Sequence, residues 1–190
     1  MAKFIWGFLT GMLVAILAIF AFGYFMAESF MDDTSSEQLS SPALMLDSTT
    51  QNNSVLNMSL VNLKTGKLLD TNTFKNRVVV LNFWERWCIP CRQELPSLER
   101  LNSIVKDSSI VICIISTQNQ EKTAEENVVS EFSIPFYHLK SLLPIPYKDD
   151  RVPRTYIINK SGNIVVSTIG ACRWDDSTVV NLIDSLKKVN

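Results

Sequence analysis

The stretch "WERWCIPCRQELP" (residues 84–96) places two cysteines, Cys88 and Cys91, three residues apart. A pair at this spacing can form a redox centre, half of a metal site or a structural disulfide. The apolar run "RVVVLNFW" (77–84) predicts a strand buried on both faces, and the leucine spacing from residue 95 onward predicts a helix. Cys88 therefore lies where a strand ends and a helix begins, and there the unpaired backbone N–H groups and the helix dipole stabilise a thiolate.

The position of each cysteine predicts a separate role in thiol-disulfide exchange. Stabilising the thiolate lowers the thiol pKa, so Cys88 is expected to be the attacking sulfur. Cys91 lies on the same helical face inside the first turn, is expected to be less exposed, and is the predicted resolving thiol. Pro90 fixes φ and needs no N–H in the first turn, so it holds the two sulfurs in a rigid loop.

Metal binding and a permanent disulfide are the alternatives. A zinc site needs four ligands, and the remaining candidates, Cys113, Cys172 and His138, offer no second close pair. Copper binding by Cys88, Cys91 and His138 stays an alternative, although a proline-containing CxxC at a helix start favours redox chemistry. A two-residue loop constrains the unfolded chain very little, which disfavours a purely structural disulfide. We expect no metal and no other cofactor.

Glu94 is the candidate proton carrier. On a helix it lies three residues after Cys91, on the same face and one turn deeper. A carboxylate there can exchange a proton with the resolving thiol, directly or through water. The alternative is a surface glutamate in an exposed turn.

The other segments predict a single α/β domain. Alternating βαβ units followed by an antiparallel pair and a helix argue for a mixed central sheet with helices on both faces. The expected elements are a hairpin that turns at residues 64–67, strands at 77–84 and 109–116, helices at 88–105 and 121–132, a short strand at 135–137, a hairpin at 155–170 and a closing helix at 175–188.

Two segments together carry a family resemblance, "VVVLNFWERWCIPCRQELPSLERL" and the later "VPRTYIINKSGNIVVSTIG". They resemble the thioredoxin fold, in particular the membrane-anchored, extracytoplasmic thiol-disulfide reductases of the TlpA, ResA and DsbE type. The resemblance covers about residues 56–188. It implies a redox disulfide between Cys88 and Cys91, protein disulfides as substrates and a membrane electron donor that reduces the enzyme again.

The resemblance also assigns roles to single residues. Pro153 would be a cis-proline that faces the two cysteines, and the backbone of Val152 would pair with an extended substrate segment. Trp87 is expected to pack against the redox loop and cover part of its face. It is the third predicted substrate-binding residue. A functional acid of these reductases falls on Glu94 in "CIPCRQELP", while Asn82 stands where cytoplasmic thioredoxins carry a buried aspartate.

Three features depart from the usual family pattern. Glu85 and Arg86 place an unusual charge pair at the expected rim of the active site. Arg154 gives Pro-Arg-Thr where Pro-Thr-Thr or Pro-Glu-Thr is commoner, and no glycine precedes Val-Pro, which argues against a dedicated role in cytochrome maturation. The segment "LKSLLPIPYKDDR" (139–151) is short, contains two prolines and is expected to be a loop.

Three further side chains could take part in chemistry. Cys113 lies in an apolar strand and is expected to be an inert core thiol. Cys172 follows Gly170-Ala171, beside the expected substrate groove, and is either a third redox thiol or an incidental small side chain. His138 is expected to be structural or to lie on the surface.

The N-terminal segment from Phe4 to Ala27 contains no charged residue. As a helix it would be roughly 35 Å long, enough to cross a hydrocarbon core of about 30 Å. Lys3 precedes the run and acidic residues follow it, which predicts a cytoplasmic N-terminus and a domain on the extracytoplasmic, periplasmic side. The alternative is a cleaved signal peptide, with a mature chain that begins near Tyr24.

The predicted organisation is an anchor or signal sequence at 1–27, a flexible tether rich in Ser, Thr, Asn, Gln and Asp at 28–53, and a thioredoxin-like domain at 54–190. The net charge is -1 and no basic run occurs, which disfavours nucleic acid as a partner. The expected function is the reduction or exchange of disulfides in extracytoplasmic proteins. A net disulfide oxidase is the alternative, because direction depends on reduction potentials and partners.

Overall fold

The computed structural model describes residues 12, 14–22, 39–43, 57–117, 128–144 and 147–189. They fall into two units, Met1–Gln38 and Leu39–Asn190. In the first unit, residues 14–22 form a helix whose side chains are exposed. Among the described residues, no helix has the length and apolar character needed to cross a membrane. Most of the predicted anchor and tether, and residues 121–127 of the predicted helix at 121–132, lie outside the described residues.

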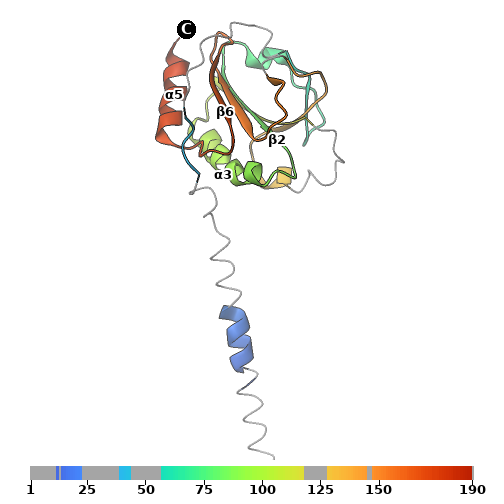
Figure 1. Cartoon of the computed structure of the whole chain (residues 1–190), viewed down its shortest axis with the longest axis vertical. Helices are drawn as coiled ribbons and strands as arrows, with labels where there is room; N and C mark the ends of the chain where they lie inside the picture. Colours follow the sequence, from blue (N-terminus) through green and yellow to red (C-terminus); the bar gives the residue numbers. More distant parts are fainter. Residues whose placement is uncertain are drawn as a thin grey trace, which may run out of the picture. The chain divides into compact units, whose positions relative to one another are not determined.

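The second unit is built on a six-stranded mixed sheet with the strand order β1-β4-β3-β2-β5-β6 (Figure 1). β3 runs parallel to β2 and β4, whereas β1 is antiparallel to β4, β5 to β2 and β6 to β5. The strands are β1 (Leu60–Asn62), β2 (Val78–Trp84), β3 (Ile110–Ser116), β4 (Phe136–Leu139), β5 (Arg154–Ile158) and β6 (Ile164–Ile169). The expected strands after residue 77 are confirmed.

The helices that this unit contains include the 3-10 helix η2 (Thr71–Phe74) and the α-helices α3 (Ile89–Ile104) and α5 (Ser177–Lys188). α3 begins directly after its N-cap, Cys88, and has Pro90 in its first turn, where no N–H is needed. α5 begins after Asp176, whose Oδ1 accepts a hydrogen bond of 2.8 Å from the backbone N–H of Thr178. The predicted helix at 88–105 and the closing helix are both confirmed.

The alternation of side chains along β2 decides what each face of the sheet packs against, because successive residues of a strand point to opposite faces. All seven residues of β2 are buried, as the apolar run predicts. Val78, Val80 and Trp84 belong to the core that includes Leu95 and Leu98 of α3, together with residues of α5. A fully buried leucine of this kind contributes about 2 kcal/mol of transfer free energy. Asn82 has the same parity, so the only polar side chain on this face of β2 points toward α3.

The opposite face of the sheet differs from the prediction of helices on both faces. There Val79, Leu81 and Phe83 pack with Phe74 of η2 and with Tyr147 from the segment between β4 and β5. Within the described residues, this face is covered by a 3-10 helix and loop segments rather than by an α-helix. The segment at 139–151 is short and contains two prolines, which restrict helix formation.

The predicted hairpin near residue 64 is present, but its two arms pair over a short length. The backbone N–H of Asn62 donates to the carbonyl of Lys67 at 2.9 Å, and Gly66 adopts φ +67° at the turn. A positive φ of this size favours glycine. The returning arm makes a single isolated bridge, Val61 to Leu68, and β1 also pairs with β4.

Candidate active site

The redox pair lies at the end of β2, on the turn that leads into α3. The backbone N–H of Cys88 donates to the carbonyl of Glu85 at 3.0 Å, which closes this turn. Cys88 and Cys91 form a disulfide, with their Cα atoms 5.3 Å apart. Sγ of Cys88 also accepts a hydrogen bond of 3.2 Å from the backbone N–H of Cys91. The sulfur thus faces the free N–H groups of the α3 N-terminus, as the sequence predicts.

The two cysteines differ in exposure in the predicted direction. Cys88 is 4% exposed, whereas Cys91 is 0% exposed. Of the two, Cys88 is therefore the one with some solvent exposure. This asymmetry fits an attacking role for Cys88 and a resolving role for Cys91, and both roles remain predictions.

Trp87 and Arg86 are the exposed residues of the turn. Trp87 is 59% exposed, and its expected packing against the redox loop stays a prediction. It lies directly before Cys88 and offers an apolar surface beside the reactive sulfur. Its predicted part in substrate binding remains a prediction.

Glu85 does not lie at the rim of the site, and the prediction of a charge pair there is wrong for this residue. Its side chain is 2% exposed. Oε1 accepts hydrogen bonds from the backbone N–H (2.9 Å) and hydroxyl (2.8 Å) of Thr117, and Oε2 accepts one from the hydroxyl of Ser116 (3.1 Å). The carboxylate is therefore occupied at the end of β3, where it fixes the redox turn to the sheet.

The Val152–Pro153 peptide bond is cis, which confirms that part of the prediction. Phe83 of β2 pairs with Arg154 of β5, so Pro153 lies beside the end of β2, which leads into the Cys88 turn. The carbonyl of Pro153 accepts a hydrogen bond of 2.8 Å from the N–H of Gly170. Val152 is partly buried against the core on the α3 side.

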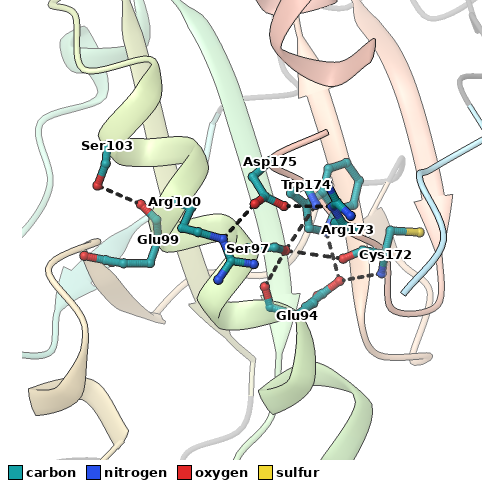
Figure 2. Close-up of polar contacts among 9 residues, drawn as sticks. All are labelled: Glu94, Ser97, Glu99, Arg100, Ser103, Cys172, Arg173, Trp174 and Asp175. Carbon is teal, nitrogen blue, oxygen red and sulfur yellow. Dashed lines mark hydrogen bonds and ion pairs between the residues drawn. The ribbon is translucent and has the colours of Figure 1, made fainter. Parts of the chain in front are cut away.

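Glu94 is fully buried and accepts hydrogen bonds at both carboxyl oxygens, so the alternative of a surface glutamate is wrong. Oε1 accepts a hydrogen bond of 2.7 Å from Nδ2 of Asn82. Oε2 accepts one of 2.9 Å from Nε1 of Trp174 and one of 3.1 Å from the backbone N–H of Cys172. Figure 2 shows the segment that contains Cys172 and Trp174 lying against α3 at Glu94.

Burial raises the pKa of Glu94 from about 4.5 to about 7. Loss of hydration disfavours the charged carboxylate, and the hydrogen bonds from Trp174, Asn82 and Cys172 act in the opposite direction without cancelling it. A carboxyl group with a pKa near neutrality can both take up and give back a proton at physiological pH. This property suits a proton carrier for the resolving thiol.

Cys172 contacts Glu94 through its backbone N–H rather than through its sulfur. Its Sγ lies 3.8 Å from the carbonyl of Gly170, and Figure 2 shows the sulfur pointing away from Glu94. Burial, and then the charge of Glu94, raise the pKa of the thiol to about 11. At neutral pH it is a protonated thiol and a weak nucleophile.

Cys113 and His138 lie away from the redox pair. Cys113 is 0% exposed in β3, and burial raises the pKa of its thiol. His138 lies on β4 and is 8% exposed, and burial lowers its pKa. Within the part of the chain that the structure describes, no three His, Cys, Asp or Glu side chains come together as a metal site. Copper binding by Cys88, Cys91 and His138 therefore has no support in the geometry.

Two residues of the site were not predicted from the sequence, Trp174 and Thr155. Oγ1 of Thr155 accepts a second hydrogen bond from Nδ2 of Asn82, at 2.8 Å. A signal for burial of Glu94 was present, because Glu94 precedes Leu98 and Leu101 at helical i, i+4, i+7 spacing. No comparable signal marks Trp174, which lies 80 residues from Glu94 along the chain.

A family model described as Redoxin matches residues 50–183. The chain belongs to the Redoxin family. The thioredoxin-like protein YneN of Bacillus subtilis is 30% identical over 47% of this chain and 55% of its own length. The thiol-disulfide oxidoreductase ResA of Bacillus cereus is 28% identical over 55% of this chain and 62% of its own length. The chain thus spans less than two thirds of the length of these two relatives.

Solved structures share the fold. A crystal structure of the thioredoxin domain of a thiol-disulfide oxidoreductase from Bacteroides vulgatus has a TM-score of 0.54 and 23% identity, over 69% of this chain and 93% of that chain. The second unit therefore has a thioredoxin-like fold. Together with the family match, this confirms the predicted resemblance to thioredoxin-like proteins of the TlpA, ResA and DsbE type.

Proposed function

We propose that this protein is a membrane-anchored thiol-disulfide oxidoreductase that reduces or exchanges disulfides in extracytoplasmic proteins. The observation that carries the proposal is the Cys88–Cys91 pair at the start of α3, with Cys88 as the N-cap. The cis-Pro153 segment lies beside the strand that leads into this pair. Relatives named ResA are thiol-disulfide oxidoreductases, and the family match includes all of these residues.

The reaction begins from the reduced pair, with a thiolate on Cys88 and a thiol on Cys91. Sγ of Cys88 attacks one sulfur of the substrate disulfide, a mixed disulfide forms, and the first substrate thiolate leaves. Cys91 then transfers its proton to the Glu94 carboxylate and attacks Sγ of Cys88. The Cys88–Cys91 bond forms, the mixed disulfide breaks, and the second substrate thiolate leaves with the proton from Glu94. Two electrons have passed to the substrate, and the enzyme is oxidised.

The substrate segment binds around Cys88 on three residues. Its backbone pairs with the backbone of Val152, next to Pro153, and its apolar side chains contact the exposed ring of Trp87. Support comes from the 59% exposure of Trp87 and from the position of Pro153 beside the end of β2. Backbone pairing tolerates different substrate sequences, because it uses groups that every residue carries.

Turnover requires re-reduction of the Cys88–Cys91 disulfide, and we assign this step to a membrane electron donor. The anchor is the uncharged run from Phe4 to Ala27. Lys3 ahead of this run orients the N-terminus toward the cytoplasm and the redox domain toward the extracytoplasmic side. The domain and its donor then share one membrane surface.

The decisive experiment traps the mixed disulfide in cells that produce the full chain. Cys91→Ser removes the resolving thiol and keeps the attacking one, so covalent complexes that dithiothreitol releases should accumulate on non-reducing gels. The matched control, Cys88→Ser, should trap almost none. More complexes with Cys88→Ser than with Cys91→Ser would contradict the proposed roles.

The direction of exchange follows from a second measurement. The reduction potential of the Cys88–Cys91 pair, determined by equilibration with glutathione or dithiothreitol buffers, is compared with that of the compartment. A potential below that of the compartment supports the reductase. A potential well above it supports the alternative of a net disulfide oxidase.

A further inference from the structure

The loop between β6 and α5 contacts the active-site helix at three successive positions. At the first, Cys172 and Trp174 donate hydrogen bonds to Oε2 of Glu94. At the second, the backbone N–H of Trp174 donates to Oγ of Ser97 at 3.1 Å. At the third, Nε of Arg100 forms an ion pair of 2.7 Å with Oδ2 of Asp175 (Figure 2). The second and third contacts hold the loop on α3 without involving the Glu94 carboxylate.

The two oxygens of Glu94 are therefore not equivalent. Oε2 accepts two hydrogen bonds, which occupy both of its lone-pair directions. Oε1 accepts one, from Nδ2 of Asn82, and keeps one direction open. A proton that arrives at Oε1 displaces no donor, whereas a proton at Oε2 must displace one.

We propose that Trp174 is a positioning residue for proton transfer at Glu94: with the backbone N–H of Cys172 it occupies Oε2, and so makes Oε1 the atom that takes the proton. The proposal rests on the proposed function, because it concerns the proton that leaves Cys91. Trp174 is 0% exposed, and its backbone N–H donates to Ser97, a contact that does not involve the Glu94 carboxylate. It acts through Glu94 and has no contact with the substrate in this assignment.

Trp174 also favours the ionised form of Glu94. The indole N–H donates to a carboxylate oxygen, so it acts to lower the pKa that burial raises. The groups that face Glu94 from β2 and β5 are neutral, Asn82 and Thr155. On α3, Cys88 and Cys91 are joined as a disulfide and carry no titratable proton in the oxidised protein. On the loop, the Cys172 sulfur points away from Glu94, and farther along lie the charges of Arg100, Arg173 and Asp175.

The chain offers a matched control in Trp84. This tryptophan is also 0% exposed, but its Nε1 has no hydrogen-bond partner among the described residues. Trp174→Phe and Trp84→Phe each remove one indole from the same core. Only the first removes a donor to Glu94.

The experiment follows the Glu94 carboxyl signal by ¹³C NMR against pH in the oxidised full chain, with Glu94→Gln to assign the signal. Trp174→Phe should raise the pKa of Glu94 by about one to two units, the range expected for losing a hydrogen bond to a charged group. The pH profile of mixed-disulfide resolution should move upward by the same amount. Trp84→Phe should leave the pKa of Glu94 unchanged.

An unchanged pKa of Glu94 in folded Trp174→Phe would overturn the proposal. If this variant does not fold, benzothienylalanine incorporated at position 174 replaces the N–H with sulfur and keeps the ring size, and the same criterion applies. Failure of the proposed function looks different. In that case Cys91→Ser traps no more mixed disulfides than Cys88→Ser, whatever the pKa of Glu94 in the Trp174 variant.

Discussion

Nδ2 of Asn82, in the middle of β2, donates a hydrogen bond of 2.7 Å to Oε1 of Glu94 on α3. Both side chains are 0% exposed. The amide carries no charge, so it hydrogen-bonds the carboxylate without adding a positive charge that would offset the loss of hydration. Ionisation of this buried carboxyl group therefore lowers the free energy of unfolding.

The stability of the domain should therefore fall as pH rises through neutrality. The pKa of Glu94 is about 7 in the folded protein and about 4.5 when unperturbed, so the folded state holds its proton more tightly. The stabilisation is complete below pH 4.5 and is lost as pH rises through 7. Over this window the contribution to the free energy of unfolding falls by about 3 kcal/mol. Urea denaturation of the oxidised protein from pH 5 to pH 8.5 measures it, and Glu94→Gln should flatten the curve.

Glu99, one turn and a half farther along α3, supplies the control for this prediction. Partial burial acts to raise its pKa, but hydrogen bonds from Ser133 and Ile134 outweigh burial, and the pKa is lowered. Its stabilising effect belongs to the ionised form and disappears only in acid. Glu99→Gln should leave the slope between pH 5 and pH 8.5 as in the parent. The same slope in Glu94→Gln and the parent would show that Glu94 is not the source.

Cys172→Ser should leave the trapped mixed disulfides of the Cys91→Ser background unchanged. The Cys172 thiol has a pKa of about 11, and the group that contacts Glu94 is its backbone N–H, which serine keeps. In the reduced protein at pH 8, iodoacetamide should modify Cys88 well before Cys172. A changed set of trapped partners would instead support a third redox thiol.

Arg154→Lys should destabilise the domain by about 1–3 kcal/mol. The guanidinium is 1% exposed, donates to the carbonyls of Arg151 (2.8 Å) and Tyr147 (3.2 Å), and lies 4.4 Å from the ring centroid of Phe83. A lysine ammonium lacks the planar fork that makes these contacts together. Thermal or urea denaturation measures the loss.

Arg151→Lys is the matched control for Arg154. Its side chain is 69% exposed and pairs with Asp149 at the surface, where such pairs are worth about 0–1 kcal/mol. The change in the free energy of unfolding should stay within about 0.5 kcal/mol. Equal losses at both positions would contradict a structural role specific to Arg154.

The full chain should fractionate with membranes, and protease added outside cells stripped of any outer barrier should digest the domain from residue 54 onward. The reason is the uncharged run from Phe4 to Ala27 behind a single lysine. N-terminal sequencing of the mature protein checks the alternative. Release of a soluble species that begins near Tyr24 would identify the run as a cleaved signal.

The sequence by itself determined the local elements and the redox motif. Period-2 and period-3.6 patterns depend on neighbouring residues, so the strands after residue 77, α3 and α5 could be predicted from them. The place of Cys88 at a strand-to-helix junction likewise follows from adjacent segments. The cis bond at Pro153 came from resemblance to a family, since no local pattern specifies it.

Only the tertiary structure decided which buried side chains meet across the fold. The sequence predicts Glu85 as a charge at the rim of the site, yet its carboxylate accepts a hydrogen bond from Thr117 at the end of β3. In the sequence Arg154 is only a departure from the family motif, yet its guanidinium packs on the ring of Phe83. Trp174 reaches Glu94 from 80 residues away. Contacts of this kind depend on strand order and on how a loop docks against a helix, and these are set by the packing of the whole core rather than by the pattern of any one segment.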